Sequence, residues 1–212
     1  MTADTQARNH FYDGWIYRKF IDPSLTGIRK RVLRLLPENS RVLDVGCGTG
    51  DQLFYISKHI QTGVGVELSA TMINTCQEQA RIKEITNCEF LLADARNLVS
   101  LKDKSFDYAI ISMVLHEMPK EYRIPVLTEM IRLGKQLILV DWIHPQPGLM
   151  KKVSTHIIER LAGREHYAGF RSFIKEGGMP TLIKTLGLEI IESQITGKGT
   201  IQLWVVNTDK KQ

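Results

Sequence analysis

Three glycines stand within five positions, Gly46, Gly48 and Gly50, and an aspartate stands on either side of them, Asp44 before and Asp51 after. They directly follow an apolar run, in the stretch VLDVGCGTGDQ. Glycine loses more backbone freedom on folding than any other residue, so three together predict a loop whose backbone must approach a ligand closely. The two carboxylates favour a ligand that carries positive charge, such as an α-ammonium or a sulfonium group.

Two phosphate-binding loops fit these residues less well. A P-loop needs Gly-Lys followed by Ser or Thr after its glycines, whereas Asp51-Gln52 follows Gly50. A dinucleotide loop of the pattern GxGxxG that began at Gly46 would place its third glycine at position 51, where this chain has aspartate. A carboxylate there would repel a pyrophosphate at the start of the following helix.

Two further acids follow apolar runs. Glu67 ends the run GVGVE, and Asp94 follows the run CEFLLA. A carboxylate at the end of a strand can accept hydrogen bonds from both ribose hydroxyls, which predicts this role for Glu67. Asp94 is a candidate acceptor for an adenine amino group, with a neighbouring backbone N–H available to a ring nitrogen. Together with Asp44, these acids predict a ligand in which a nucleoside is joined to a charged amino acid.

These side chains need a sheet that brings several strand ends to one edge. Runs rich in Val, Ile and Leu alternate with helical patterns, which predicts right-handed βαβ units and a parallel sheet covered on both faces. After the fifth run, a stripe with a spacing of four residues predicts a helix over 149–161, and residues 188–206 predict an antiparallel hairpin. The runs interpreted as buried strands are residues 41–46, 63–67, 88–93, 106–113 and 136–142.

Length and composition indicate one domain. At 212 residues with 43% hydrophobic content, the chain can bury a sizeable core. The net charge of +5 is too small to imply nucleic acid, and the three cysteines lack metal-ligand spacing and fit a reducing compartment. The chain shows no signal-peptide pattern, and its longest apolar run, 108–115, falls short of the ~18 residues of a membrane span. We expect a cytoplasmic protein without stable membrane insertion.

We divide this single domain into four consecutive parts. They are a helical N-terminal arm (1–38), a cofactor-binding core (39–143), a helical substrate cap (144–187) and a C-terminal hairpin (188–208).

The motifs VLDVGCGTG, GVELSATMI, LLADARNL and FDYAIISMVLHEM resemble, in order and spacing, those of class I S-adenosylmethionine-dependent methyltransferases. The resemblance covers about residues 40–142. It implies a Rossmann-like α/β fold with a seven-stranded, mostly parallel sheet whose last strand is antiparallel, with helices on both faces. It also implies S-adenosylmethionine as cofactor and S-adenosylhomocysteine as product.

The resemblance further implies roles by position. Gly46, Gly48 and Gly50 would meet the methionyl part of the cofactor, and Asp44 would support its ammonium group. Glu67 would bind the ribose. The other positions at which the matching motifs imply cofactor contact are Cys47, Thr49, Leu68, Asp94 with Ala95 at the adenine, and Ser112. In related enzymes an aromatic N-terminal segment such as FYDGWIYRKF folds over the cofactor, which places Tyr17 at the methionyl end.

Missing motifs narrow the choice of methyl acceptor. The chain lacks the Asp/Asn-Pro-Pro-aromatic turn of adenine-amino and glutamine methyltransferases, the Pro-Cys nucleophile of cytosine-C5 enzymes and the paired glutamates of arginine methyltransferases. Of the carboxylates that catechol-type enzymes use to hold a metal, Asp141 could supply only one, so we expect no metal. The class of acceptor that remains is a small, partly apolar molecule that is methylated on O, N or C. A non-catalytic or partner-dependent S-adenosylmethionine-binding protein is the alternative, and a homodimer is left open.

Two histidines are candidates for the chemistry. His116, in LHEMP, follows the fourth strand, and its near-neutral pKa suits a general base. His144 follows the fifth strand and faces the same edge. By contrast, we expect His156 and His166 on the surface of the cap. The segment FYD and the order of the motifs are similar to the ubiquinone/menaquinone C-methyltransferase-like group, although the chain has IRLGKQLILVD where that group has a Pro-Gly-Gly turn.

Overall fold

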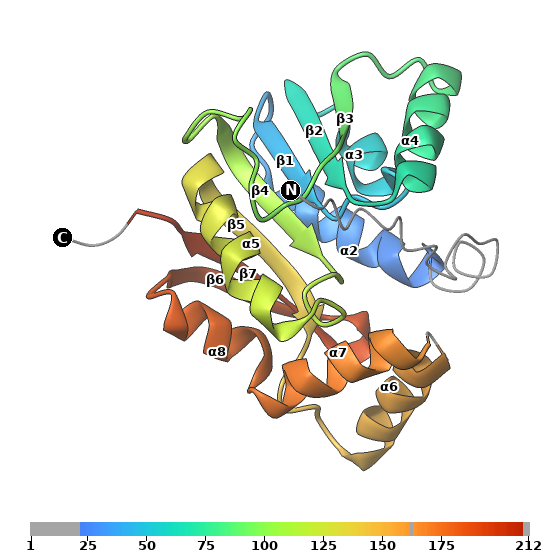
Figure 1. Ribbon diagram of the computed structural model, residues 1–212, viewed down its shortest axis with the longest axis vertical. Helices are drawn as coiled ribbons and strands as arrows, with labels where there is room; N and C mark the ends of the chain where they lie inside the picture. Colours follow the sequence, from blue (N-terminus) through green and yellow to red (C-terminus); the bar gives the residue numbers. More distant parts are fainter. Residues whose placement is uncertain (1–21, 162, 210–212) are drawn as a thin grey trace, which may run out of the picture.

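The computed structural model describes residues 22–161 and 163–209, which form one seven-stranded sheet in the order β3-β2-β1-β4-β5-β7-β6 (Figure 1). Strands β1 to β5 pair in parallel, and β7 pairs antiparallel with β5 and β6. The predicted fold class, with its antiparallel last strand, is therefore confirmed. The strands are β1 (Arg41–Val45), β2 (Thr62–Glu67), β3 (Cys88–Leu92), β4 (Phe106–Ser112), β5 (Gly134–Trp142), β6 (Glu189–Thr196) and β7 (Ile201–Asn207).

Helices cover both faces of the sheet, because the central strands bury side chains on both sides. Along β5, Ile138 and Val140 belong to one core, and Leu137 and Leu139 belong to the other. The first core includes side chains of α2 (Asp22–Leu35), α3 (Asp51–Ile56) and α4 (Ala70–Ile82). The second includes side chains of α5 (Lys120–Leu133) and α8 (Gly178–Thr185).

Two further helices lie beyond the ends of β4 and β5, namely α6 (Leu149–Leu161) and α7 (Arg164–Lys175) (Figure 1). The chain leaves the sheet after Trp142, forms this helical pair and returns with α8, whose Met179 and Ile183 are buried in the second core. We call α6 and α7 the cap. The predicted cap, 144–187, also included α8, which packs against the sheet instead. The division of the chain into four parts stays a prediction.

The helical stripe predicted over 149–161 exists, but it faces outward. Val153, Ile157 and Leu161 are exposed, whereas the buried side chains of α6 are those of Thr155 and Glu159. The polar side of α6 therefore turns toward the sheet, where Glu159 has charged partners.

No helix in the described part of the chain is both long enough and apolar enough to cross a membrane. The aromatic segment FYDGWIYRKF, with Tyr17, lies outside the described residues.

Candidate active site

The glycine loop connects β1 to α3 and is tied to β2, because the amides of Gly46 and Cys47 both donate to the carbonyl of Val66, at 2.8 and 3.1 Å. Packing requires two of its glycines. Gly46 has φ +68°, and a Cβ there would lie 2.8 Å from the side chain of Val114. Gly50 has φ +79°, and a Cβ there would lie 2.9 Å from the ring of Phe90.

Gly48 differs from these two glycines. It also has a positive φ, +54°, but a Cβ there would meet nothing closer than the sulfur of Met72 at 4.0 Å. The room above its backbone is open, which fits the close approach of a ligand. The thiol of Cys76 donates to the Gly48 carbonyl at 3.1 Å and fixes the loop from behind.

Asp44 lies under this loop with 3% of its surface exposed, and its Oδ2 is buried without a hydrogen-bond partner. Burial and the charge of Glu67 raise the pKa of Asp44 to about 7, while Arg29 acts in the opposite direction. A buried acceptor without a partner is costly, and a cation reduces that cost. The site therefore fits the ammonium group of an amino acid.

Glu67 is held in place by backbone amides at the end of β2. Its Oε1 accepts from Leu68 at 2.8 Å and from Ser69 at 3.1 Å, and its Oε2 accepts from Gly48 at 3.2 Å. The carboxylate is therefore fixed at the end of the strand, and its role as a ribose ligand stays a prediction. The side chain of Leu68 beside it is 65% exposed.

Asp94 is paired with Arg96, which the sequence did not indicate. Both carboxylate oxygens of Asp94 accept from the guanidinium of Arg96, whose Nε lies 3.0 Å from each, and the guanidinium is also stacked 3.8 Å from the ring centre of Tyr122. These hydrogen bonds lower the pKa of Asp94. An adenine amino group that reached Asp94 would share it with Arg96, and Ala95 lies half-buried beside it.

The remaining predicted cofactor residues surround the loop. The Cys47 thiol is buried and next to Cys76; this contact and burial raise the pKa of Cys47 well above its usual range, which keeps it a thiol. Thr49 donates from Oγ1 to Asp51 at 2.7 Å. Ser112, half-buried, ends β4.

The residue after Ser112 has a strained backbone. Met113 has φ +59°, a region that is unfavourable for a side chain of this size, and its amide donates to Val140 at 2.8 Å. This turn directs the following segment, 114–119, toward the cap. Such strain concentrates at functional sites.

His116 is buried between β5 and the cap, with 3% of its surface exposed. Its Nδ1 lies 2.8 Å from Asp141 Oδ1, and its Nε2 lies 3.5 Å from Glu159 Oε2. Burial lowers the pKa of His116, but the charge and hydrogen bond of Asp141 and the charges of Glu159 and Glu117 together outweigh that effect, so the net change is upward. Both ring nitrogens thus face carboxylates, which leaves little room for a general base that must reach an acceptor.

Glu159 and His166 complete this cluster from the cap. Glu159 accepts from the indole Nε1 of Trp142 at 2.7 Å, and its other oxygen accepts from His166 Nε2. His166 Nδ1 lies 2.8 Å from Glu117 Oε2. The ligand atoms of His116, Glu159 and His166 all lie within 4.8 Å of one another, so these three residues could hold a metal ion. The expectation that His166 is a surface residue is wrong, because two carboxylates draw it inward.

A second set of contacts fastens α7 to the 114–119 segment. The buried guanidinium of Arg123 donates to the carbonyls of Leu115 at 3.1 Å, Met118 at 2.9 Å and Gly169 at 2.8 Å. A Cβ at Gly169 would lie 2.5 Å from the carbonyl oxygen of Glu117, so only glycine permits this approach.

His144 lies apart from the cluster. Its Cβ contacts Gly178 at the start of α8, where a Cβ would lie 3.0 Å from it, and its Nδ1 is buried without a partner. The described contacts therefore do not join it to His116, and a catalytic role for either histidine stays a prediction.

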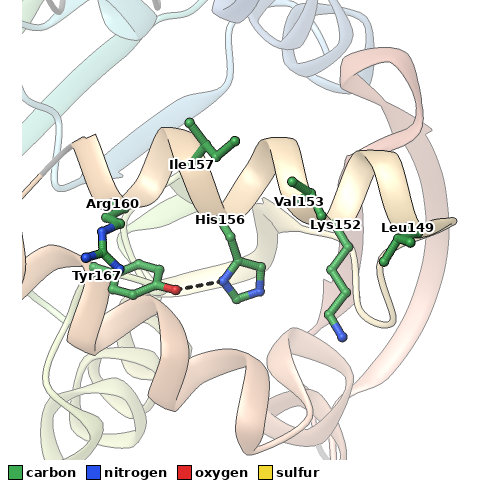
Figure 2. A pocket seen from close by; sticks show the side chains of 7 residues that line it. All are labelled: Leu149, Lys152, Val153, His156, Ile157, Arg160 and Tyr167. Carbon is green, nitrogen blue, oxygen red and sulfur yellow. Dashed lines mark hydrogen bonds between the residues drawn. The ribbon is translucent and has the colours of Figure 1, made fainter.

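A groove of about 270 Å³ runs along the outer side of the cap (Figure 2). His156 points into it and lies with Nδ1 3.1 Å from the hydroxyl of Tyr167. The predicted cofactor residues do not line it. Ile157 of α6 and Tyr167 of α7 do, while Phe170 and Phe173 of α7 are buried in the core. Its lining residues are Leu149, Lys152, Val153, His156, Ile157, Arg160 and Tyr167.

Comparison with known proteins agrees with this geometry. A family model described as a methyltransferase domain matches residues 42–136. A demethylmenaquinone methyltransferase of Lactiplantibacillus plantarum is 28% identical over 124 residues, which are 56% of this chain and 52% of that protein. The methyltransferase GfsG of Streptomyces halstedii is 27% identical over 194 residues, which are 87% of this chain and 67% of that one. This chain spans about half the length of the demethylmenaquinone methyltransferase.

The fold has a similar counterpart among solved structures. A SAM-dependent methyltransferase from Aquifex aeolicus superposes with a TM-score of 0.64 at 20% identity, covering 91% of this chain and 97% of that one. Its strands and those described above share one architecture. The family match, which runs from β1 to the start of β5, and the shared architecture make the chain similar to the class I S-adenosylmethionine-dependent methyltransferases, which use S-adenosylmethionine as cofactor.

Proposed function

We propose that this protein transfers the methyl group of S-adenosylmethionine to O, N or C of a small, partly apolar molecule. The observation that carries the proposal is the combination of Gly48 and Asp44. Gly48 has an open backbone position in the loop, and Asp44, in the strand that leads into the loop, has a buried carboxylate oxygen without a partner. This arrangement fits a ligand that combines a cationic amino acid with a nucleoside, and Glu67 stands fixed at the next strand end.

The cap supplies the features expected of an acceptor site. Its groove combines the apolar side chains of Leu149, Val153 and Ile157 with the cations Lys152 and Arg160. An apolar ring that carries an acidic oxygen matches this lining. The relative from Lactiplantibacillus plantarum is named as a demethylmenaquinone methyltransferase, which supports a small-molecule acceptor.

Methyl transfer from a sulfonium is an in-line displacement, so the enzyme mainly supplies proximity and alignment. The breaking bond joins the methyl carbon to sulfur and the forming bond joins that carbon to the acceptor, with S-adenosylhomocysteine as the second product. The enclosure of His116 between two carboxylates favours acceptors that need no strong base, such as acidic hydroxyls. The same enclosure of His116 also fits the alternative, a non-catalytic S-adenosylmethionine-binding protein.

The decisive experiment uses methyl-labelled S-adenosylmethionine with a panel of phenolic and quinol acceptors, after calorimetry with S-adenosylhomocysteine. We expect binding and labelled product. Binding without product from any acceptor or from a metabolite extract would favour the non-catalytic alternative, and no binding at millimolar ligand would contradict both.

A pair of neighbouring variants locates the acceptor. Ile157→Lys places a charge in the groove, and Ile158→Lys places the same charge on the same helix outside the groove lining. We expect the first to raise the acceptor KM at least tenfold, with the second unchanged. Equal effects would move the acceptor site away from this groove.

Location and assembly stay predictions. A cytoplasmic location is expected from the sequence alone. If the chain forms a homodimer, we propose the edge strand β6 as the contact, because Ile190, Ile191 and Ile195 are about half exposed on it.

A further inference from the structure

We propose that His116, Glu159 and His166 form a binding site for a divalent transition metal, of the type that zinc occupies, at the junction between the sheet and the cap. The proposal is independent of the methyl acceptor. It replaces our expectation from the sequence that the protein holds no metal.

The first argument is the convergence of the ligand atoms. His116, Glu159 and His166 belong to three segments of the chain, and each offers one ligand atom within 4.8 Å of the other two. Both histidines face Glu159 Oε2 with Nε2. Zinc binds imidazole nitrogen and carboxylate oxygen at roughly 2.0–2.2 Å, so neighbouring ligands of a tetrahedral ion are about 3.3 Å apart. The 3.5 Å between His116 Nε2 and Glu159 Oε2 is close to that spacing and is longer than a normal hydrogen bond.

The second argument concerns the other nitrogen of each imidazole. His116 Nδ1 lies 2.8 Å from Asp141, and His166 Nδ1 lies 2.8 Å from Glu117. A metal-bound histidine nearly always donates its second N–H to a carboxylate or carbonyl, which fixes its orientation. Both histidines meet this condition, and both direct Nε2 toward the same oxygen of Glu159.

The third argument is how firmly the carboxylate ligand is held. Glu159 Oε1 accepts from Trp142 Nε1 at 2.7 Å, so Oε2 is the oxygen that a metal would take, in place of the direct hydrogen bond between His166 Nε2 and Oε2. The rings of Trp142, Phe170 and Phe173 surround His116, with ring centres 6.3 to 6.5 Å away. The site is thus preorganised and largely shielded from water. Two imidazoles and one carboxylate are the protein ligand set of several zinc sites that keep a fourth position open.

A metal bound here would join the 114–119 segment to α6 and α7 and so fix the cap on the sheet. The competing explanation is a network of protonated histidines and carboxylates that holds the same elements together without a metal. The two explanations differ in whether the protein binds a transition metal stoichiometrically.

The test is a titration of the purified, untagged, metal-stripped protein with Co²⁺, followed by visible absorption, with Zn²⁺ used to displace it. We expect one Co²⁺ per chain, d–d bands of a four- or five-coordinate ion, and a Tm that rises by several degrees with Zn²⁺. Glu159→Gln and His166→Ala should lose stoichiometric binding. His156→Gln, on the same helix as Glu159 but outside the cluster, should keep it.

The buried variants could lose metal binding simply because they do not fold, so the test also includes Glu117→Gln. Glu117 is exposed and would affect the metal only through its contact with His166. This variant should weaken Co²⁺ binding roughly 10- to 100-fold with unchanged circular dichroism. Absence of stoichiometric Co²⁺ and Zn²⁺ binding by the wild-type protein, or equal binding by all four variants, would overturn the proposal. Calorimetry with S-adenosylhomocysteine reports separately on the cofactor site, so the two proposals can fail independently.

Discussion

The ligand edge of this sheet has two halves, which differ in whether their buried polar groups have hydrogen-bond partners. At the ends of β1 and β2, Gly48 opens to free space and Asp44 keeps a buried oxygen without a partner. At the ends of β4 and β5, by contrast, His116 and Arg123 are almost wholly enclosed by hydrogen-bond partners. The first half is preorganised for a ligand at a cost in stability, and the second half is a fastened junction that supports the cap. Replacement of a polar side chain should therefore lower the stability of the protein in the second half and raise it in the first.

The largest loss of stability should follow Arg123→Ala. This change leaves the carbonyls of Leu115, Met118 and Gly169 without their donor in a buried position, so we expect the free energy of unfolding to fall by about 3–5 kcal/mol. Urea denaturation measures it. Arg171→Ala, on the exposed side of α7, is the control and should change stability by less than about 0.5 kcal/mol. Similar losses in both variants would contradict the view of Arg123 as the fastener.

Replacement of Asp44, by contrast, should increase the stability of the protein. The Asp44 pKa of about 7 in the folded chain lies above the ordinary value near 3.9, so the folded state holds a proton that the unfolded state has lost between these pH values. The contribution of Asp44 to stability should therefore decline as pH rises from about 4 to 7, by at most about 4 kcal/mol, and stay constant above 7.

Asp44→Asn should remove that decline and make the protein about 2–4 kcal/mol more stable than wild type at pH 8, while it weakens binding of S-adenosylhomocysteine. Wild-type affinity should rise with pH through about 7, because the charged carboxylate attracts the ammonium group. Unfolding and calorimetry at pH 5, 7 and 8 measure both trends. A flat stability profile in this range would show that Asp44 is ionised throughout.

A smaller effect separates two glycines of one loop. Gly46→Ala should destabilise the protein by about 2 kcal/mol, because its Cβ meets Val114 at 2.8 Å. Gly48→Ala should cost only about 1 kcal/mol, through its positive φ, and reduce affinity for S-adenosylhomocysteine at least tenfold, since the Cβ fills the space for the ligand. Each variant serves as the other's control. If Gly48→Ala bound the ligand normally, the cofactor would have to lie elsewhere.

The smallest expected change concerns Arg96, which is exposed and pairs with Asp94. Arg96→Ala should leave stability almost unchanged, because surface ion pairs contribute little. It should tighten S-adenosylhomocysteine binding by about threefold, because Asp94 is then free for the adenine amino group. Calorimetry distinguishes this from a loss of affinity, which would mean that Arg96 holds Asp94 in its binding position.

The sequence predicted the first half of the edge better than the second. The glycine spacing and the acids at strand ends are local signals, and each predicted strand lies within two residues of an observed one. The orientation of α6 was not accessible in this way. A spacing of four residues indicates which side chains share a face, but not whether that face turns inward, and here the charged partners of Glu159 decide it. His166 was missed because its partners Glu117 and Glu159 come from other segments. Arg96 has a local partner, Asp94, but the ring of Tyr122 on which it stacks comes from α5.

The path of the cap has a consequence for engineering and for divergence among relatives. Because α6 and α7 leave the sheet after β5 and return to it at α8, residues 149–175 form an exchangeable cassette. A replacement that preserves Gly169, Glu159, His166 and the core residues Phe170 and Phe173 would retain the contacts with the 114–119 segment and the sheet and change the outward groove. If the acceptor binds in that groove, as proposed, the choice of acceptor can vary without a change in the glycine loop.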